Sequence, residues 1–487
     1  MPSTTAFLAL AAAVPLALAE TLTNETVLGV YMFHRHGDRT AKMTPPANLT
    51  TLGYQEVYTS GNYYRGRYIA ADAPYRISGI NTDVVKQSQI AVSAPADTVL
   101  QNSAIGFLQA LYPPTGSGND VETLANGTQV TSPMDGYQLI PVSLVSSGSG
   151  SEDNGWLQSA SGCANATLSS NEYFSSKEYT SLLSSTQEFY TALTPVLNST
   201  FPSSGISFKN AYTIFDYINV GEIHNASISN YDNLLTNETL FQLRTLADSH
   251  EWGLAYNGSD DMRAVAGKVL AGQIVEFLNG TVTGKGKQKL GIQFGAYGTF
   301  ASFFGLAGLA QVDPTLKGVA DYASAMSFEL FTNGSQKVSS TNFPSNDDIY
   351  VRFLFHNGTT SNISEPVSYP LFGSGKEVMA WNDFTTGMNK FAIGNTNEWC
   401  TACGNYTGTC AAYAPAETNS SANEPSTEVK SGNGLSPVIN GVIGAMVTLA
   451  VVLGLEALIL VVGGFKVVSK KSLAGGAAGG HGSNVKA

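Results

Sequence analysis

The stretch that decides how this chain folds covers residues 27–39, Val-Leu-Gly-Val-Tyr-Met-Phe-His-Arg-His-Gly-Asp-Arg. Its first part, residues 27–33, is almost entirely apolar, which is typical of a strand buried on both faces. Just beyond it, His36 stands between Arg35 and Arg39, whose planar guanidinium groups match phosphate oxygens. Because a neutral imidazole can attack phosphorus, the stretch predicts a phosphate site with His36 as nucleophile and the two arginines as phosphate clamps.

Taken alone, residues 35–39 leave a second interpretation open, a surface charge cluster that happens to contain a histidine. The segments that follow favour the phosphate site. Residues 49–53 (LTTLG) and 65–68 (RGRY) resemble the LTxxG and RxRY motifs that follow the signature RHGxR in the histidine acid phosphatases. Residues 100–114, which contain LQALYPP, are similar to the next helix of those proteins and its exit. On these motifs the chain is identified as a member of that family.

Strands separated by long helical regions predict an α/β fold, a three-layer sandwich with a mainly parallel central sheet. The resemblance implies an inserted, mostly helical cap at residues 115–285. The expected strands and helices near the site are the strand 27–33, the helices 50–69 and 97–111, the strand 290–294 and the helix 299–309.

Three positions depart from what the resemblance implies. The family carries a further phosphate-binding arginine where this chain has Ser93, and a His-Asp pair where it has Tyr297 and Gly298. The missing aspartate is the acid that protonates the leaving group, and such acids contribute about 10²–10⁴-fold. The resemblance therefore implies a phosphomonoesterase with a phosphohistidine intermediate whose activity is weak or altered. The alternative is an inactive pseudophosphatase that binds a phosphorylated ligand or is a structural surface glycoprotein.

The other histidines do not restore the missing acid. His250 and Glu251 are interpreted as a solvated pair on a helix, and His224 as part of an exposed loop beside a glycosylation acceptor. His34 is interpreted as structural. We expect no metal and no cofactor.

The net charge of the chain limits which classes of molecule it can bind. The 487 residues carry a formal net charge of −12, and only 13% of them are charged. An acidic surface argues against nucleic-acid binding. The expected partner is a phosphomonoester or another phosphorylated small molecule.

Residues 1–19 predict a signal peptide, because a long apolar run ends in Ala-Leu-Ala. Export agrees with fourteen Asn-x-Ser/Thr acceptors for N-glycans, all before residue 438. In an oxidising compartment, the four cysteines predict two disulfides rather than a zinc site, in any of three pairings. One disulfide must join Cys163 to the C-terminal group, which consists of Cys400, Cys403 and Cys410.

The C-terminal part predicts attachment to a membrane. After a phosphatase-like ectodomain at residues 20–413, residues 414–437 predict a disordered stalk and residues 438–465 a transmembrane helix. Lysines in the tail, residues 466–487, place the tail in the cytosol, as in a single-pass type I protein of the cell membrane. Glu456 within the span suggests self-association of the helix, and a tolerated protonated carboxyl is the alternative.

Overall fold

The computed structural model describes residues 25–116, 121–144, 161–334 and 337–415. These residues belong to one unit, Met1–Pro415, whereas the second unit, Ala416–Ala487, contains no described residue. The predicted signal peptide, the predicted cytoplasmic tail and nearly all of the predicted stalk therefore lie outside the described residues.

The predicted localisation, a single-pass membrane protein, is corrected by the length and hydropathy of the described helices. In the described ranges, none is both long and apolar enough to cross a bilayer. The longest two, α11 (Asn237–Ala255) and α12 (Val265–Thr283), have 19 residues each and place buried side chains in the cores of the folded unit. The segment 438–465, with Glu456, lies outside the described residues.

The central sheet has the strand order β10-β8-β7-β1-β6-β2-β5, with β9 paired to β8. β1 and β6 are parallel, and so are β6 and β2, whereas β7, β8 and β10 run antiparallel to their neighbours. The predicted α/β class is confirmed, but the sheet is mixed rather than mainly parallel, because the pairings on the β7 side of β1 are antiparallel. The strands are β1 (Thr26–Arg35), β2 (Ile90–Ala94), β5 (Ser143–Leu144), β6 (Leu290–Gly295), β7 (Ala325–Thr332), β8 (Ile349–His356), β9 (Val367–Ser368) and β10 (Val378–Ala380), besides the separate hairpin of β3 (Val121–Thr123) and β4 (Gln129–Thr131).

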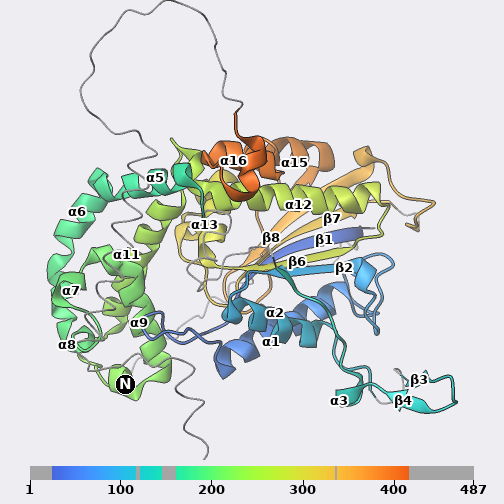
Figure 1. Ribbon diagram of the computed structural model, residues 1–487, viewed down its shortest axis with the longest axis horizontal. Helices are drawn as coiled ribbons and strands as arrows, with labels where there is room; N and C mark the ends of the chain where they lie inside the picture. Colours follow the sequence, from blue (N-terminus) through green and yellow to red (C-terminus); the bar gives the residue numbers. More distant parts are fainter. Residues whose placement is uncertain (1–24, 117–120, 145–160, 335–336, 416–487) are drawn as a thin grey trace, which may run out of the picture. The chain divides into compact units, whose positions relative to one another are not determined.

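Helices cover both faces of the sheet (Figure 1). One core contains buried side chains of α1 and α2 with those of β1, β2 and β6. The other contains side chains of α12, α13 and α15 with those of β7 and β8. This arrangement is the predicted three-layer sandwich. These helices are α1 (Thr51–Tyr68), α2 (Thr98–Leu111), α13 (Tyr297–Leu306) and α15 (Trp381–Met388), in addition to α12.

A separate helical lobe lies beside the sheet and has its own apolar core. Its core residues come from the region between Tyr173 and Leu246. The resemblance implied a cap at 115–285, yet α12 packs on the sheet rather than in this lobe. The lobe helices are α5 (Ala164–Glu172), α6 (Lys177–Ser185), α7 (Gln187–Ala192), α8 (Thr194–Leu197), α9 (Ala211–His224), α10 (Ala226–Ser229) and α11.

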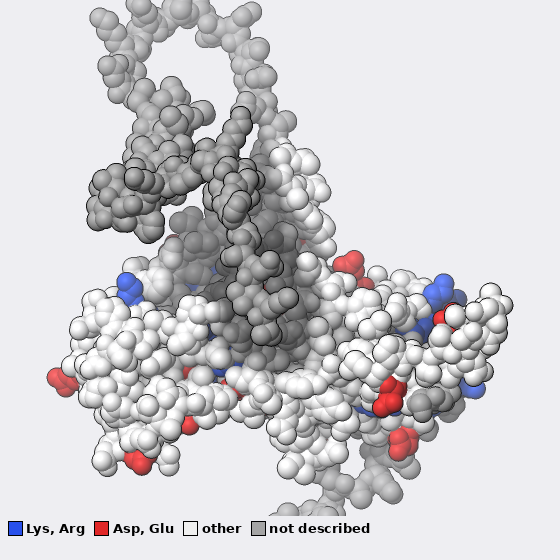
Figure 2. Space-filling model, turned by 60° about the horizontal axis from the view of Figure 1, so that its bottom comes forward, with Lys and Arg blue, Asp and Glu red and all other residues white. Residues whose placement is uncertain are grey.

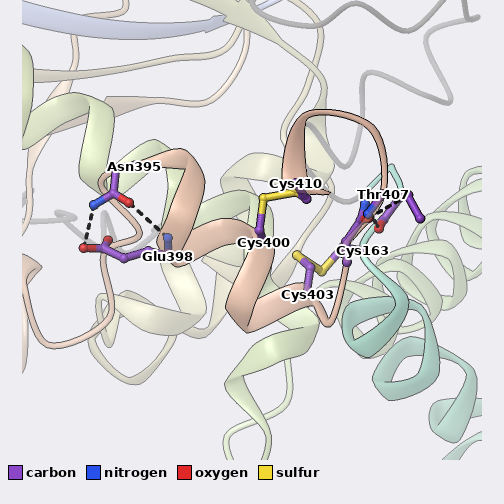
Figure 3. The surroundings of a disulfide bond; sticks show 9 residues. Cys163, Asn395, Glu398, Cys400, Cys403, Thr407 and Cys410 are labelled. Atoms are coloured by element: carbon purple, nitrogen blue, oxygen red, sulfur yellow. Dashed lines mark hydrogen bonds between the residues drawn. A yellow bond between two sulfur atoms is a disulfide. The ribbon is translucent and has the colours of Figure 1, made fainter. Parts of the chain in front are cut away.

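One of two disulfides ties the end of the unit to the lobe, and the other closes a short loop within that end. Cys163, next to α5, is bonded to Cys403 at the end of α16 (Thr396–Cys403), and Cys400 is bonded to Cys410 (Figure 3). The structure thus confirms the prediction of two disulfides, one of which joins Cys163 to the C-terminal group. It also selects one of the three possible pairings. Among the described residues, none of the acceptor asparagines is buried, and N-glycan attachment stays a prediction.

The RxRY motif stabilises the sheet. Arg67 forms an ion pair with Glu329 of β7 at 2.7 Å, and Arg352 of β8 binds the other oxygen of the same buried carboxylate at 2.6 Å. Although burial opposes ionisation of Glu329, the two guanidiniums lower the pKa of its carboxyl below the usual value. Arg67 therefore acts far from the predicted nucleophile.

Candidate active site

Two strand ends meet where the sequence predicted the site. β1 and β6 pair in parallel with Arg35 opposite Gly295, so residues 36–39 and 297–298 emerge at the same edge of the sheet. Ligand sites of α/β sheets form at this carboxyl edge. The segment before β7 closes it, since Ala323 N donates to His36 O at 2.8 Å.

A pair of glycines brings the loop after β1 against helix α1. A Cβ atom on Gly37 would stand 2.2 Å from Gly53 O, and one on Gly53 would stand 2.0 Å from Asp38 O. Side chains at either position would push these backbones apart. Gly37 N also donates to Ser103 Oγ of α2 at 3.2 Å, so both helices of this layer position the loop.

The His36 ring is oriented by its own loop. Its Nδ1 atom lies 2.7 Å from Gly37 O, and a carbonyl oxygen can only accept. Nδ1 therefore carries the proton, which leaves the lone pair on Nε2. The ring is buried, with its centroid 5.5 Å from that of Tyr322. This is the tautomer that a nucleophilic histidine requires.

Arg35 lies beside His36 with part of its donor set unused. One terminal nitrogen donates to Ala320 O, and the guanidinium carbon lies 4.4 Å from the ring centroid of Tyr322 and 5.2 Å from that of Tyr297. Its Nε–H group is buried and has no hydrogen-bond partner in the described part of the chain. Buried donors are almost always paired, so this orphan marks a place where an oxyanion would fit.

Arg39, the second predicted clamp, is occupied by a carboxylate. Asp216 of α9 binds both of its terminal nitrogens, at 2.8 and 3.1 Å, and both side chains are buried. Tyr212 and Thr40 accept further hydrogen bonds from the same two nitrogens. A bidentate pair of this kind is the geometry that a phosphate would otherwise take. Phosphate binding by Arg39 stays a prediction, and it would have to displace Asp216.

Tyr297 starts a buried chain of hydrogen bonds. Its hydroxyl donates to Glu251 Oε2 at 2.8 Å, and the other oxygen of Glu251 lies 2.7 Å from His250 Nδ1. Both members of the His250-Glu251 pair are buried, so the interpretation as a solvated pair is wrong. The sequence could not show this because the pair faces the lobe core and α13 at once.

The remaining altered positions offer no replacement group. Gly298, the second residue of α13, is buried and has no side chain to donate a proton. Ser93 lies on β2 opposite Gln293 of β6, so neither position carries a cation. Lys42 adds positive charge, since its Nζ lies 4.8 Å from the ring centroid of Tyr212 and 5.6 Å from that of Tyr297.

Asp38, in the loop after β1, contacts a histidine of the lobe. His224, the last residue of α9, places Nε2 2.6 Å from Asp38 Oδ1. It therefore lies at the end of a helix and not in a loop, although it is exposed, as the neighbouring acceptor suggested. Asp38 Oδ2 is buried without a partner among the described residues.

Two other histidines are structural. His34 packs between Phe107 and Phe294 and hydrogen-bonds to Ser60, and burial lowers its pKa to about 4. This agrees with the structural role expected for it. His356 bonds to Gly358 O and Ser364 Oγ at the end of β8. In the described ranges, no group of three or more His, Cys, Asp or Glu side chains could hold a metal ion.

The comparisons with known proteins give the family. A model of the histidine phosphatase superfamily, branch 2, matches residues 41–356, and this chain belongs to that family. A search of curated proteins gives no match.

Solved structures agree on the fold. The phytase from Citrobacter braakii has 13% sequence identity and a TM-score of 0.50, covering 78% of this chain and 99% of its own. The phytase of Klebsiella sp. ASR1 has 10% identity and a TM-score of 0.51, covering 76% of this chain and 96% of its own. At such identities the likeness extends to the fold and not to the activity.

Proposed function

We propose that this protein is a weak phosphomonoesterase that works through a phosphohistidine on His36. The observation that carries the proposal is the bond from His36 Nδ1 to Gly37 O, which leaves Nε2 as the basic atom of the ring. Membership of the histidine phosphatase family supports the same chemistry.

The reaction has two steps. The lone pair of His36 Nε2 attacks phosphorus, and the bond from phosphorus to the ester oxygen breaks, so that the leaving group departs with that electron pair. Water then attacks the phosphohistidine, the P–N bond breaks, and phosphate is released with His36 restored. The Nε–H donor of Arg35, which lacks a partner, would stabilise the charge that develops on the phosphoryl oxygens.

The substrate class follows from Gly298. Without an acid at this position, a leaving alkoxide would have to depart unprotonated, which costs about 10²–10⁴-fold in rate. A phenolate is a far more stable anion and needs no such help. We therefore propose phosphorylated small molecules with good leaving groups, such as aryl phosphates, as the substrates that turn over fastest.

One observation favours a second function, a pseudophosphatase that binds a phosphorylated ligand without turnover. Asp216 neutralises Arg39 in a buried bidentate pair, and Glu251 adds another carboxylate beneath Tyr297. Both carboxylates reduce the positive charge available to a phosphate dianion, and a dianion would compete directly with Asp216 for Arg39.

The test uses purified protein and p-nitrophenyl phosphate. We expect release of phosphate and an acid-labile phosphoryl label on His36, both abolished by His36→Ala. His356→Asn, at a histidine outside the site, is the matched control and keeps both signals. Turnover that survives His36→Ala would end the catalytic proposal, and phosphate binding without label or turnover would establish the pseudophosphatase.

A further inference from the structure

A cluster of lysines lines a pocket of about 290 Å³ between the turn after α12 and the segment after β7. Lys285, Lys287 and Lys289 contribute to its wall, and Ser78, Ser339 and Ser340 add hydroxyl groups. None of the described residues that line it is acidic. In a chain with a formal net charge of −12, such a concentration of positive charge needs an explanation.

Lys289 is the central group. Only 8% of the residue is exposed, and its Nζ atom donates to Ser78 O. That carbonyl is its single hydrogen-bond partner in the described part of the chain, where no carboxylate pairs with it. An ammonium group has three donors, so two of them remain available. Burial, together with Lys86, lowers the pKa of Lys289, which is the expected response to missing negative charge.

Two glycines keep the space beside this ammonium open. Gly79 and Gly286 have φ angles of +68° and +73°, and a Cβ on either would stand 3.5 Å from Lys289 Nζ. Backbone in this left-handed region favours glycine, and here glycine also leaves a cradle that a side chain would fill.

The helix dipole accounts for only part of the cluster. Lys285 follows the end of α12, and a cation at a helix C-terminus is favourable without any ligand. Lys289, by contrast, belongs to the entry of β6, where its backbone bonds to Gln89 O and to Val30 N. The dipole therefore gives no reason for a buried ammonium without a counter-charge.

We propose that this pocket binds a small oxyanion of the phosphate type. The Lys289 ammonium would donate hydrogen bonds to the oxyanion, and Lys285 and Lys287 in the pocket wall would add positive charge. Leu28 of the pocket and His36 of the candidate active site are eight residues apart along the β1 segment, which is roughly 26 Å at a rise of about 3.3 Å per residue. The pocket is thus a site of its own at the opposite edge of the sheet.

Figure 2 shows a face on which charged side chains are sparse, and both basic and acidic side chains appear toward its right-hand end. The positive charge of the pocket therefore rests on Lys285, Lys287 and Lys289 themselves.

Lysine acylation with mass spectrometry tests the proposal on the full chain. Inorganic phosphate or pyrophosphate should slow acylation of Lys285, Lys287 and Lys289 several-fold, while Lys317, Lys376 and Lys390 react at unchanged rates. Chloride at the same ionic strength is the control for screening. Equal protection of all six lysines, or of none, would overturn the proposal.

A pair of variants gives a second measurement. Lys287→Gln should weaken anion binding at this pocket about tenfold, since a hydrogen bond to a charged group is lost. Lys317→Gln, which also removes one lysine, should leave the affinity unchanged. Because protection is read at the pocket lysines themselves, failure of phosphorylation at His36 would leave this result intact, and the reverse also holds. The same anion affinity in both variants would contradict the proposed site.

Discussion

Two segments at the carboxyl edge of the sheet differ in how far they match the motifs of the family. The signature segment, residues 35–39, keeps His36, the proposed nucleophile, whose ring is oriented by Gly37 O. The second segment, residues 296–299, leaves the adjacent parallel strand and begins α13 with Tyr297 and Gly298. The tyrosine there binds Glu251, so a chain of buried hydrogen bonds occupies the place where the resemblance implies a His-Asp pair.

The difference shows that the two motif segments are held by contacts to different parts of the fold. The signature segment depends on β1, α1 and α2 through Gly37, Gly53 and Ser103. The second segment depends on α11 of the lobe through Glu251. The two segments nonetheless meet at Tyr297, whose ring centroid lies 5.2 Å from the guanidinium carbon of Arg35, so a change in one segment also alters the surroundings of the other.

The largest expected effect comes from removing the carboxylate charge of Asp216, which pairs with Arg39. Asp216→Asn should cost about 3–5 kcal/mol in the free energy of unfolding, because a buried guanidinium loses its counter-charge. Phosphate should then restore more stability than it gives the unmodified protein, as measured by thermal unfolding with and without phosphate. Glu329→Gln, which breaks a buried ion-pair network away from the site, should be destabilised without this gain. An identical phosphate response in both variants would show that Arg39 does not face the ligand.

Acid should destabilise the folded protein through His34, which directly precedes the signature segment. Its pKa is lowered to about 4 in the folded protein, chiefly by burial, so the protonated ring favours the unfolded chain. This contribution is fully present above the unfolded pKa of about 6.5 and is lost as the pH falls toward 4, amounting to about 3 kcal/mol. Urea unfolding at several pH values should show a shallower dependence for His34→Gln than for the unmodified protein. Equal slopes would contradict the burial of a neutral ring.

Restoring the family's His-Asp pair in the second segment should change the hydrolysis rates of alkyl and aryl phosphates by different factors. The double variant Tyr297→His with Gly298→Asp should raise hydrolysis of alkyl phosphates about 10²-fold, since an acid can again protonate the leaving oxygen. Hydrolysis of aryl phosphates should change far less. A rise of equal size for both classes, measured as kcat/KM, would mean that the leaving group is already protonated by some other residue.

The smallest effect concerns the hydroxyl of Tyr297. Tyr297→Phe removes a hydrogen bond to a carboxylate and should cost about 1.5–3 kcal/mol in chemical denaturation. Tyr190→Phe is the matched control, because the buried Tyr190 hydroxyl has no partner among the described residues and its removal should be nearly neutral. If the two variants lose the same stability, the bond to Glu251 contributes nothing net.

The local pattern around residues 27–39 was sufficient to predict much of the site. A continuous apolar run ending in Arg-His-Gly-Asp-Arg predicted both the buried strand and the place of His36. The family resemblance placed the altered positions 297 and 298 after a strand and before a helix expected at 299–309, whereas in the structure α13 already begins at Tyr297. It failed for Glu251 and Asp216, because neither residue lies in a motif and each reaches the site from the lobe.

The sequence alone determined the elements whose cause is local: the buried β1, the glycines at 37 and 53, the family, and an even set of cysteines for disulfides. Tertiary structure alone decided which charges meet. Arg39 became paired with Asp216 and Tyr297 with Glu251 because α9 and α11 pack against the edge of the sheet, more than 40 residues away along the chain in each case. Apolar periodicity is set by neighbours in sequence, whereas the partner of a buried charge is set by whichever element the fold places beside it.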